Sequence, residues 1–454
     1  MSKLITRKSR SGFYHDLFVL VLPIVIQNLI SSCVSLADVV MLGQVNQTAL
    51  SASSLAGQVQ FLLNILYFGL NSALVILASQ YWGKGDRKTI SKILGIGLII
   101  SMIASTAAAV LAIACPTAVM HIWTNDPELI KSGAEYLRFV SVSYLCMGIS
   151  QMYLSIMKSC ERVKLSTAVS TVALVSNVIL NAILIFGLFG APKMGLAGAA
   201  IATSIARAIE LAICIVHFMK QSLIPKSIRN MFTIPKTLLS DFAHYSLPAL
   251  VNDAMWGLAF NMNSIIMGHL GSDIVAANSV VTTVRDLCTT LGFSISAASS
   301  ILIGKELGEN KMGEARKDSS SIMFVSFISS VAAGLVIFVL TPVIPGMVAI
   351  SDTAAGYLKV MLYINVFYQG GQIINTVLIA SLFRAGGQSR YGMILDIICM
   401  WCWAVPAGLI SAFVLKLPPL AVYAIMCTDE FVKLPFALHH YKSGTWLKNL
   451  TRSY

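Results

Sequence analysis

Twelve long apolar segments, separated by short polar ones, run along the chain. A transmembrane helix needs ~20 mostly apolar residues, and each segment meets that length. We therefore predict an all-α integral membrane protein with twelve transmembrane helices. The predicted spans are residues 17–42, 54–82, 91–116, 135–157, 166–189 and 195–218 in the first half, and 239–267, 279–304, 320–346, 357–383, 391–415 and 418–440 in the second.

Charge supports this class and gives the helices an orientation. Only 11% of the residues are charged, against about 25% in a typical soluble chain. With the N-terminus placed inside, 25 Lys and Arg residues fall on inner segments and span ends and six on the outer side, Arg285 among the six. Positive residues gather on the cytoplasmic side of membrane proteins, so we expect both termini to be cytoplasmic. The net charge of +12 then reflects orientation, and we expect no nucleic-acid binding.

The two halves of the chain are related by an offset of 225 residues. This offset aligns Pro23 with Pro248, Gly43 with Gly268, Gly83 with Gly308, and Thr203 with Thr428. Each half has an even number of spans, so both share one topology and form a parallel repeat of two pseudo-symmetric six-helix bundles. The aligned prolines are either tolerated kinks or hinges.

The repeat predicts three parts of the chain. Residues 1–218 form an N-lobe, residues 219–238 a polar cytoplasmic linker, and residues 239–454 a C-lobe. Transporters built from such repeats bind substrate between the halves and open alternately to each side of the membrane.

One carboxylate lies in the middle of an apolar run in the second half. Asp253 sits in LPALVNDAMW, between Asn252 and Trp256, and no basic residue lies within a helical turn of it. Ionisable groups inside a membrane are costly and mark function by default. We interpret Asp253 as a group that binds a proton or a cation; the alternative is a carboxyl satisfied by neighbouring side chains. Asp396 lies inside a later predicted span.

A second set of polar residues occurs in the first half. Asp38 lies toward the end of the first span, Thr203 lies on the sixth, and Asn177 and Asn181 lie four apart on the fifth. That spacing places the two asparagines on one face of a helix. Carboxylate, amide and hydroxyl oxygens suit a hard cation such as Na⁺. Alternatively, Asp38 caps a helix end near the interface.

Other charged residues within the spans are interpreted as ion pairs. Arg207 and Glu210 are three apart, and Lys433 follows Asp429 by four and Glu430 by three; such pairs neutralise each other. The chain has no GxxxxGK[ST] phosphate loop and no nucleophile constellation, so we expect neither ATP-driven pumping nor an enzyme.

Several longer stretches together resemble the multidrug and toxic compound extrusion (MATE) family. They are LPIVIQNLISSCVSLADVVMLGQV, SNVILNAILIFG with GLAGAAIATSIAR, AGGQSRYGMILDIICMWCWAVP, and YAIMCTDEFVKLPFALHHYKSGTWLKNLT, which is similar to bacterial, Firmicute-like members. The resemblance implies a twelve-helix, two-lobe exporter of organic cations and drugs, driven by inward Na⁺ or H⁺.

The resemblance also implies roles for individual residues. Asp38 matches the N-lobe carboxylate that carries cation coupling, and Asn177, Asn181 and Thr203 match its partners. Some members have a carboxylate where this chain has Asn181. Asp253 matches the acidic residue of the seventh span, where many relatives have Glu. The second C-lobe acid of some members has no match in QGGQIINTVLIASLF, and we infer that Asp396 takes its place.

We therefore predict an antiporter in a bacterial cytoplasmic membrane. It would export cationic drugs as a monomer without a cofactor, with Na⁺ or H⁺ as the coupling ion. Asp38, Asn177, Asn181 and Thr203 would couple the cation, with Asp38 as the Na⁺ ligand, and Asp253, Asn252, Trp256 and Asp396 would bind substrate or proton. The alternative is a lipid-linked oligosaccharide flippase, whose anionic substrate calls for a cavity rich in Arg and Lys. A passive channel and a membrane enzyme are the other classes considered.

Overall fold

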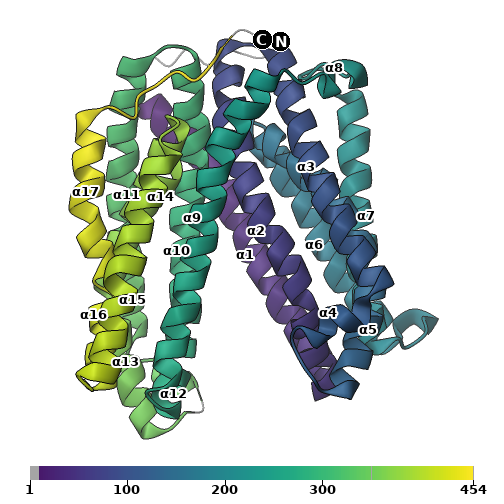
Figure 1. Cartoon of the computed structure of the whole chain (residues 1–454), viewed down its shortest axis with the longest axis vertical. Helices are drawn as coiled ribbons and strands as arrows, with labels where there is room; N and C mark the ends of the chain where they lie inside the picture. The colour runs from purple at the N-terminus through teal and green to yellow at the C-terminus, as the bar shows by residue number, and fades with distance from the viewer. Residues whose placement is uncertain (1–9, 349, 453–454) are drawn as a thin grey trace. The chain divides into compact units, whose positions relative to one another are not determined.

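Helices account for every regular element in a computed structural model of the chain, which describes residues 10–348 and 350–452 (Figure 1). No strand occurs among these residues. The elements of the first half are α1 (Arg10–Val45), α2 (Gln47–Lys84), α3 (Arg87–Ala114), α4 (Pro116–His121), α5 (Pro127–Ser159), α6 (Val163–Phe186), η1 (Leu188–Gly190), α7 (Gly195–Lys220) and α8 (Ile228–Phe232).

The second half repeats the long helices but interrupts some of them. Its elements are α9 (Lys236–Gly268), α10 (Ser272–Gly308), α11 (Met312–Leu340), α12 (Ile344–Met347), α13 (Asp352–Val377), η2 (Leu378–Phe383), α14 (Ser389–Ile397), η3 (Ile398–Ala404), α15 (Val405–Leu409), η4 (Ile410–Val414), α16 (Pro419–Met426) and α17 (Asp429–Ser443). The segments η2, η3 and η4 are π-helical, and the sequence pattern did not predict them.

Each of the twelve predicted spans falls on helix in this structure. Within the described residues, ten helices are long and apolar enough to cross a membrane. The other two predicted spans, 239–267 and 418–440, fall on α9, which is not among the ten, and on α16 and α17, which are separate short helices. The all-helical membrane fold is therefore confirmed, whereas the count of twelve spans and the cytoplasmic termini remain predictions.

The described residues divide into two compact units. One consists of Ile26–Ala243, and the other combines the first turns of α1 with His244–Arg452. In the first unit α2, α3, α5, α6 and α7 pack side by side, and in the second α10, α11, α13 and α17 do so. The borders fall inside α1 and α9, and the predicted lobes 1–218 and 239–454 with their linker 219–238 remain a prediction from the repeat.

Both aligned prolines lie inside continuous helices. Pro23 is internal to α1 and Pro248 to α9. Each removes one backbone hydrogen bond from its helix, which weakens the helix locally without ending it here. The hinge interpretation of these prolines stays a hypothesis.

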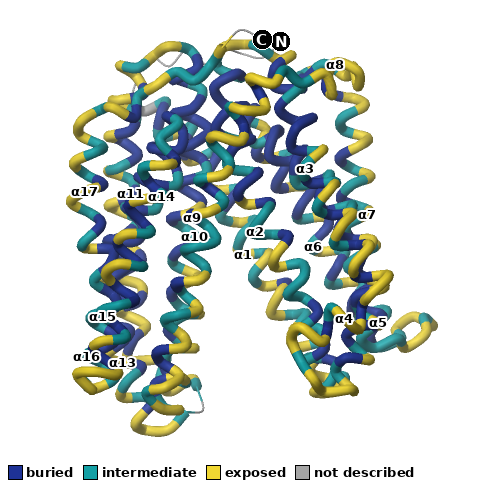
Figure 2. Tube along the Cα trace, in the orientation of Figure 1, coloured by how far each residue is buried: buried dark blue, intermediate teal, exposed yellow. Residues whose placement is uncertain are grey.

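Large apolar side chains cover much of the surface of the helices. Exposed examples are Phe18, Phe61, Phe68, Phe324 and Phe367, and Figure 2 shows exposed residues along α7 and α17. Large exposed apolar patches are rare on soluble monomers. On transmembrane helices, such side chains face the hydrocarbon of the bilayer.

Two local features bring the helices of the first unit close together. Asn46 alone separates α1 from α2, and its Oδ1 accepts a 2.6 Å hydrogen bond from the Ala49 N–H, which caps α2. On α7, a methyl group at Gly198 would lie 2.6 Å from the Leu184 carbonyl oxygen of α6. Small residues permit such close backbone approach between membrane helices.

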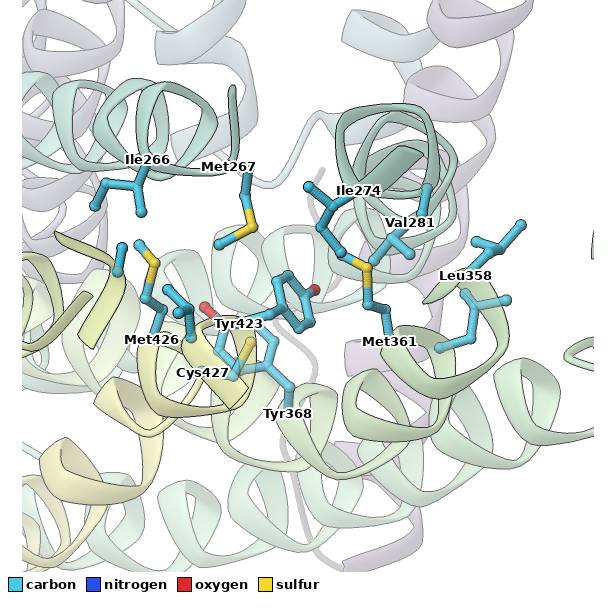
Figure 3. Close-up of a cluster of buried hydrophobic side chains, with 14 of the residues drawn as sticks. Ile266, Met267, Ile274, Val281, Leu358, Met361, Tyr368, Tyr423, Met426 and Cys427 are labelled. Carbon is cyan, nitrogen blue, oxygen red and sulfur yellow. The ribbon is translucent and has the colours of Figure 1, made fainter. Parts of the chain in front are cut away.

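The second unit has an apolar core between α9, α10, α13 and α16. Figure 3 shows Ile266, Met267, Val281, Met361 and Tyr423 among its side chains. Asn365 lies against this core, and its Nδ2 donates a 2.6 Å hydrogen bond to the Tyr423 hydroxyl and a 2.8 Å hydrogen bond to the Met361 carbonyl.

Candidate functional site

The four residues predicted to couple a cation lie together in the first unit. Asn181 Nδ2 donates a 2.6 Å hydrogen bond to Asp38 Oδ1, which joins α6 to α1. The same amide group lies 3.3 Å from Asn177 Oδ1, and Asn177 Nδ2 donates to Thr203 Oγ1 of α7 at 3.3 Å. Thr203 in turn donates to the Ala199 carbonyl at 3.0 Å. One chain of hydrogen bonds thus connects three helices.

The carboxylate of Asp38 is half-buried and has no basic partner. Among the described residues, no Lys, Arg or His forms an ion pair with it. Asn181 is 2% exposed, and its Oδ1 atom is buried without a hydrogen-bond partner. Buried polar atoms are normally satisfied, so this acceptor atom beside a carboxylate is free to bind a donor or a cation.

A cavity of about 660 Å³ opens beside these residues. It is lined by residues of α1, α2, α5, α6 and α7, and none of its lining side chains is basic. The lining residues are Asp38, Val39, Leu42, Leu50, Ser51, Ser53, Ser54, Leu55, Tyr136, Asn181, Ala199 and Thr203. Sequence analysis missed Tyr136 and the serines of α2, because hydroxyl residues in apolar helices carry no distinguishing pattern.

The alternative interpretation of Asp38 as a helix cap is wrong. Asp38 lies within α1, which continues to Val45. A side chain that caps a helix by accepting hydrogen bonds does so at its N-terminus. Asp38 is instead held by a side chain from another helix.

The second set of predicted residues divides into separate contacts. Asn252 Nδ2 donates to Asp396 Oδ2 at 2.9 Å, so these two meet in the second unit. Asp253 instead forms a 2.8 Å ion pair with Arg384. Trp256 packs on Phe260, with ring centroids 4.2 Å apart, and lies edge-on to Phe293. The structure therefore joins Asn252 with Asp396 but gives Asp253 and Trp256 other neighbours.

The expectation that Asp253 lacks a basic partner is wrong. Arg384 lies 131 residues away along the chain and follows directly on the π-helical segment η2. A partner on a distant helix leaves no mark on the residues within one helical turn of Asp253, so the local sequence does not indicate it. Arg384 also makes a further contact of its own.

Two of the three predicted ion pairs are present among the described residues, and Lys433 pairs with Asp396 where Asp429 was expected. Arg207 Nη1 lies 2.7 Å from Glu210 Oε2. Lys433 Nζ lies 3.1 Å from Glu430 Oε1 and 2.8 Å from Asp396 Oδ1. Asp396 therefore has a basic partner, Lys433, that the sequence pattern did not indicate.

Arg285 was wrongly counted among the residues on the outer side. It lies within α10, which begins at Ser272, and is only 5% exposed. Its guanidinium carbon lies 4.4 Å from the centre of the Phe260 ring, the geometry of a cation–π contact. The sequence analysis placed the start of this span at residue 279 and therefore put Arg285 near the interface.

Comparison with known proteins assigns the chain to a family. The MatE family model matches it twice, over residues 23–183 and 248–410. The two matches start 225 residues apart, the same offset as the repeat, and together they cover more than half of the chain. The chain belongs to the MatE family.

Individual relatives of this MatE protein match along nearly its whole length. The uncharacterized transporter YisQ of Bacillus subtilis (strain 168) is 21% identical over 433 residues, which is 95% of each chain. The probable multidrug resistance protein NorM of Mannheimia succiniciproducens is 23% identical over 408 residues, covering 87% of this chain and 85% of that protein.

Solved structures share the fold of this MatE protein. The Vibrio cholerae MATE transporter VcmN in its bent form has a TM-score of 0.86 at 17% identity, over 96% of this chain and 99% of its own. A MOP superfamily transporter from Pyrococcus furiosus, described as having a binding pocket of reverse polarity, has a TM-score of 0.86 at 16% identity, over 95% and 96%. With its family and its apolar helices, the chain is a multi-pass membrane transporter.

Proposed function

We propose that this transporter exports small organic cations in exchange for inward Na⁺ or H⁺. The observation that carries the proposal is the Asp38 carboxylate, which lies beside a cavity with amide and hydroxyl oxygens and no basic partner. A carboxylate kept from water gains free energy when it binds a proton or a cation. The name of one relative, the probable multidrug resistance protein NorM of Mannheimia succiniciproducens, is consistent with drug export.

In this proposal Asp38 alone carries the coupling. Asn181 would supply its unpartnered Oδ1 as a further oxygen ligand, while Asn177 and Thr203 hold the Asn181 amide in place through a chain of hydrogen bonds. Exchange requires that the coupling ion and the substrate stabilise different conformations, because a ligand shifts an equilibrium only through different affinity for the two states.

The predicted residues of the second unit receive different roles. Asp253 is paired with Arg384, and Asp396 with Lys433, so neither carboxylate is available to a coupling ion without displacing a base. Trp256, with Phe260 and Phe293, supplies an aromatic surface of the kind that attracts organic cations. We assign Trp256 to substrate binding, and Asn252 to positioning Asp396.

The flippase alternative is less well supported. An anionic lipid-linked sugar needs cationic groups in its cavity, whereas the cavity beside Asp38 is lined by one acid and no base. In the second unit, Arg384 and Lys433 are already bonded to carboxylates.

Counterflow in proteoliposomes tests the proposed substrate class. Vesicles preloaded with unlabelled tetraphenylphosphonium should accumulate external ethidium transiently and saturably, and Trp256→Ala should weaken this uptake. An Asp253→Asn variant that transports at the wild-type rate would exclude Asp253 from substrate binding. Translocation of a fluorescent lipid-linked sugar, without any ethidium counterflow, would favour the flippase.

A further inference from the structure

A group of five buried charged residues in the second unit is not balanced in charge. It contains three acids, Asp396, Asp429 and Glu430, and two bases, Lys433 and Arg285, all less than 9% exposed. We refer to these five residues as the acidic cluster. If all five were ionised, the cluster would carry a net charge of −1 inside the protein. Burying an uncompensated charge is very unfavourable, and such a group tends to neutralise instead.

The ammonium group of Lys433 forms ion pairs with two of the three carboxylates. Lys433 Nζ lies 2.8 Å from Asp396 Oδ1 and 3.1 Å from Glu430 Oε1. The remaining oxygens accept from amides: Asn252 Nδ2 lies 2.9 Å from Asp396 Oδ2, and Asn375 Nδ2 lies 2.7 Å from Glu430 Oε2. This half of the cluster is well bonded, but it has two negative charges and one positive charge.

The other half of the cluster surrounds a small cavity. Asp429 and Arg285 both line a space of about 30 Å³, together with Phe260 and Asn263, which is large enough to hold a water molecule. Arg285 forms no ion pair with any acid of the described residues, and its guanidinium rests on the Phe260 ring. The Asp429 carboxylate is therefore not held by a direct ion pair.

The cluster and its neighbours also have more buried hydrogen-bond acceptors than donors. Asp429 Oδ1, Asn252 Oδ1, Asn375 Oδ1 and Asn263 Oδ1 are buried acceptors without a partner. The two asparagines that hold Asp396 and Glu430 are 5% and 2% exposed. Protonation of one carboxylate converts an acceptor oxygen into a donor. A single proton therefore reduces the excess of acceptors and removes the excess negative charge.

We propose that the acidic cluster holds one exchangeable proton, shared among Asp396, Asp429 and Glu430. The proton comes from water, and only an O–H bond forms or breaks. A metal cation is a poorer candidate for the cavity, because the Arg285 guanidinium lines it. Titratable side chains facing the cluster are Tyr368 from α13, Cys399 from η3 and Cys427 beside α17. Tyr423 from α16 also faces Arg285. The charged groups facing the cluster are its five members and Asp286, whose exposed carboxylate interacts with Arg285.

The acidic cluster and the Asp38 group belong to different units. A role of this proton in transport rests on the proposed function. The presence of the proton does not, because it can be detected without measuring transport. Titration of the cluster would make the second unit sensitive to pH independently of Asp38.

Infrared spectroscopy of the purified full-length transporter tests the proposal directly. A protonated carboxyl group gives a carbonyl stretching band that ionised carboxylates lack and that shifts in heavy water. Asp429→Asn should lose the intensity of one carboxylic acid. Asp396→Asn and Glu430→Gln should each lose the same intensity, because removing any one acid makes the cluster neutral. Arg285→Gln should gain one carboxylic acid.

A control variant and a contrary result show whether the band belongs to the cluster. Asp286→Asn removes an exposed carboxylate next to Arg285 and should leave the cluster band unchanged. Because removal of any one acid makes the cluster neutral, the proposal is overturned if any of the three acid-to-amide variants that folds keeps the full band. An Asp38→Asn variant that retains ion-dependent efflux refutes the proposed function, but leaves the band and this inference intact.

Discussion

Asn181 presents its amide nitrogen, and not its oxygen, to the carboxylate of Asp38, at 2.6 Å. This contact stabilises the ionised carboxylate through a donated hydrogen bond, while Asn181 Oδ1 is left without a partner. A bound Na⁺ needs oxygen ligands, so its arrival would favour rotation of the amide. The pair Asp38–Asn181 is thus suited to a group that alternates between a free and a cation-bound form.

A carboxylate in place of the Asn181 amide should strengthen Na⁺ binding. Two unit charges about 4 Å apart attract with roughly 4 kcal/mol at an intermediate dielectric, and about 1.4 kcal/mol already corresponds to a tenfold change in affinity. We expect Asn181→Asp to lower the Na⁺ concentration for half-maximal efflux at least about tenfold. Gln27→Glu, which adds a charge elsewhere on α1, should not. An unchanged Na⁺ dependence in Asn181→Asp would remove this side chain from the coupling site.

The close contact of α6 with α7 should be needed for the geometry of the site. Gly198→Ala would place a methyl group against the Leu184 carbonyl, and overpacking of this kind costs about 1–3 kcal/mol. We expect a lower melting temperature in detergent and weaker coupling, because the helices carrying Asn177 and Thr203 would separate. The matched control is Gly57→Ala, where no atom lies within 4 Å of the added methyl. Equal melting temperatures for the two variants would contradict this account of the packing.

The ion pair between Asp253 and Arg384 should be structural. Arg384→Gln leaves a partly buried carboxylate without its base, and we expect a loss of about 1–3 kcal/mol in stability. Asp253→Asn added to Arg384→Gln should recover part of that loss, because the uncompensated charge is gone. A double-mutant cycle on the thermal stability measures the coupling between the two side chains. A coupling energy of zero would mean that the 2.8 Å contact contributes nothing.

Local patterns in the sequence were sufficient to predict most of the helices, but only part of the first site. Asn177 and Asn181 are four residues apart, so helical periodicity alone places them on one face. Their meeting with Asp38 required the family resemblance, because no local pattern brings α1 to α6. The structure brings these residues together in one hydrogen-bonded chain, while their role in coupling remains a prediction.

The partners of the carboxylates in the second half could not be predicted in the same way. Asp253 meets Arg384 from 131 residues away, and Asn252 meets Asp396 from 144 residues away. Such contacts depend on how helices pack, which hydrophobic periodicity does not encode. Arg285 was misplaced for a simpler reason: an error of a few residues in a helix start moves a residue from the interior to the interface.

The central claim is that Asp38 carries the coupling ion, and efflux driven by one imposed gradient at a time tests it most directly. Proteoliposomes would be given an Na⁺ gradient or a pH gradient separately, and ethidium efflux would be followed by fluorescence. In the wild-type protein one of these gradients should accelerate efflux. Asp38→Asn should lose that acceleration, while Glu135→Gln, an exposed carboxylate on α5, should keep it. Acceleration of Asp38→Asn to the wild-type rate by the same gradient would contradict the account.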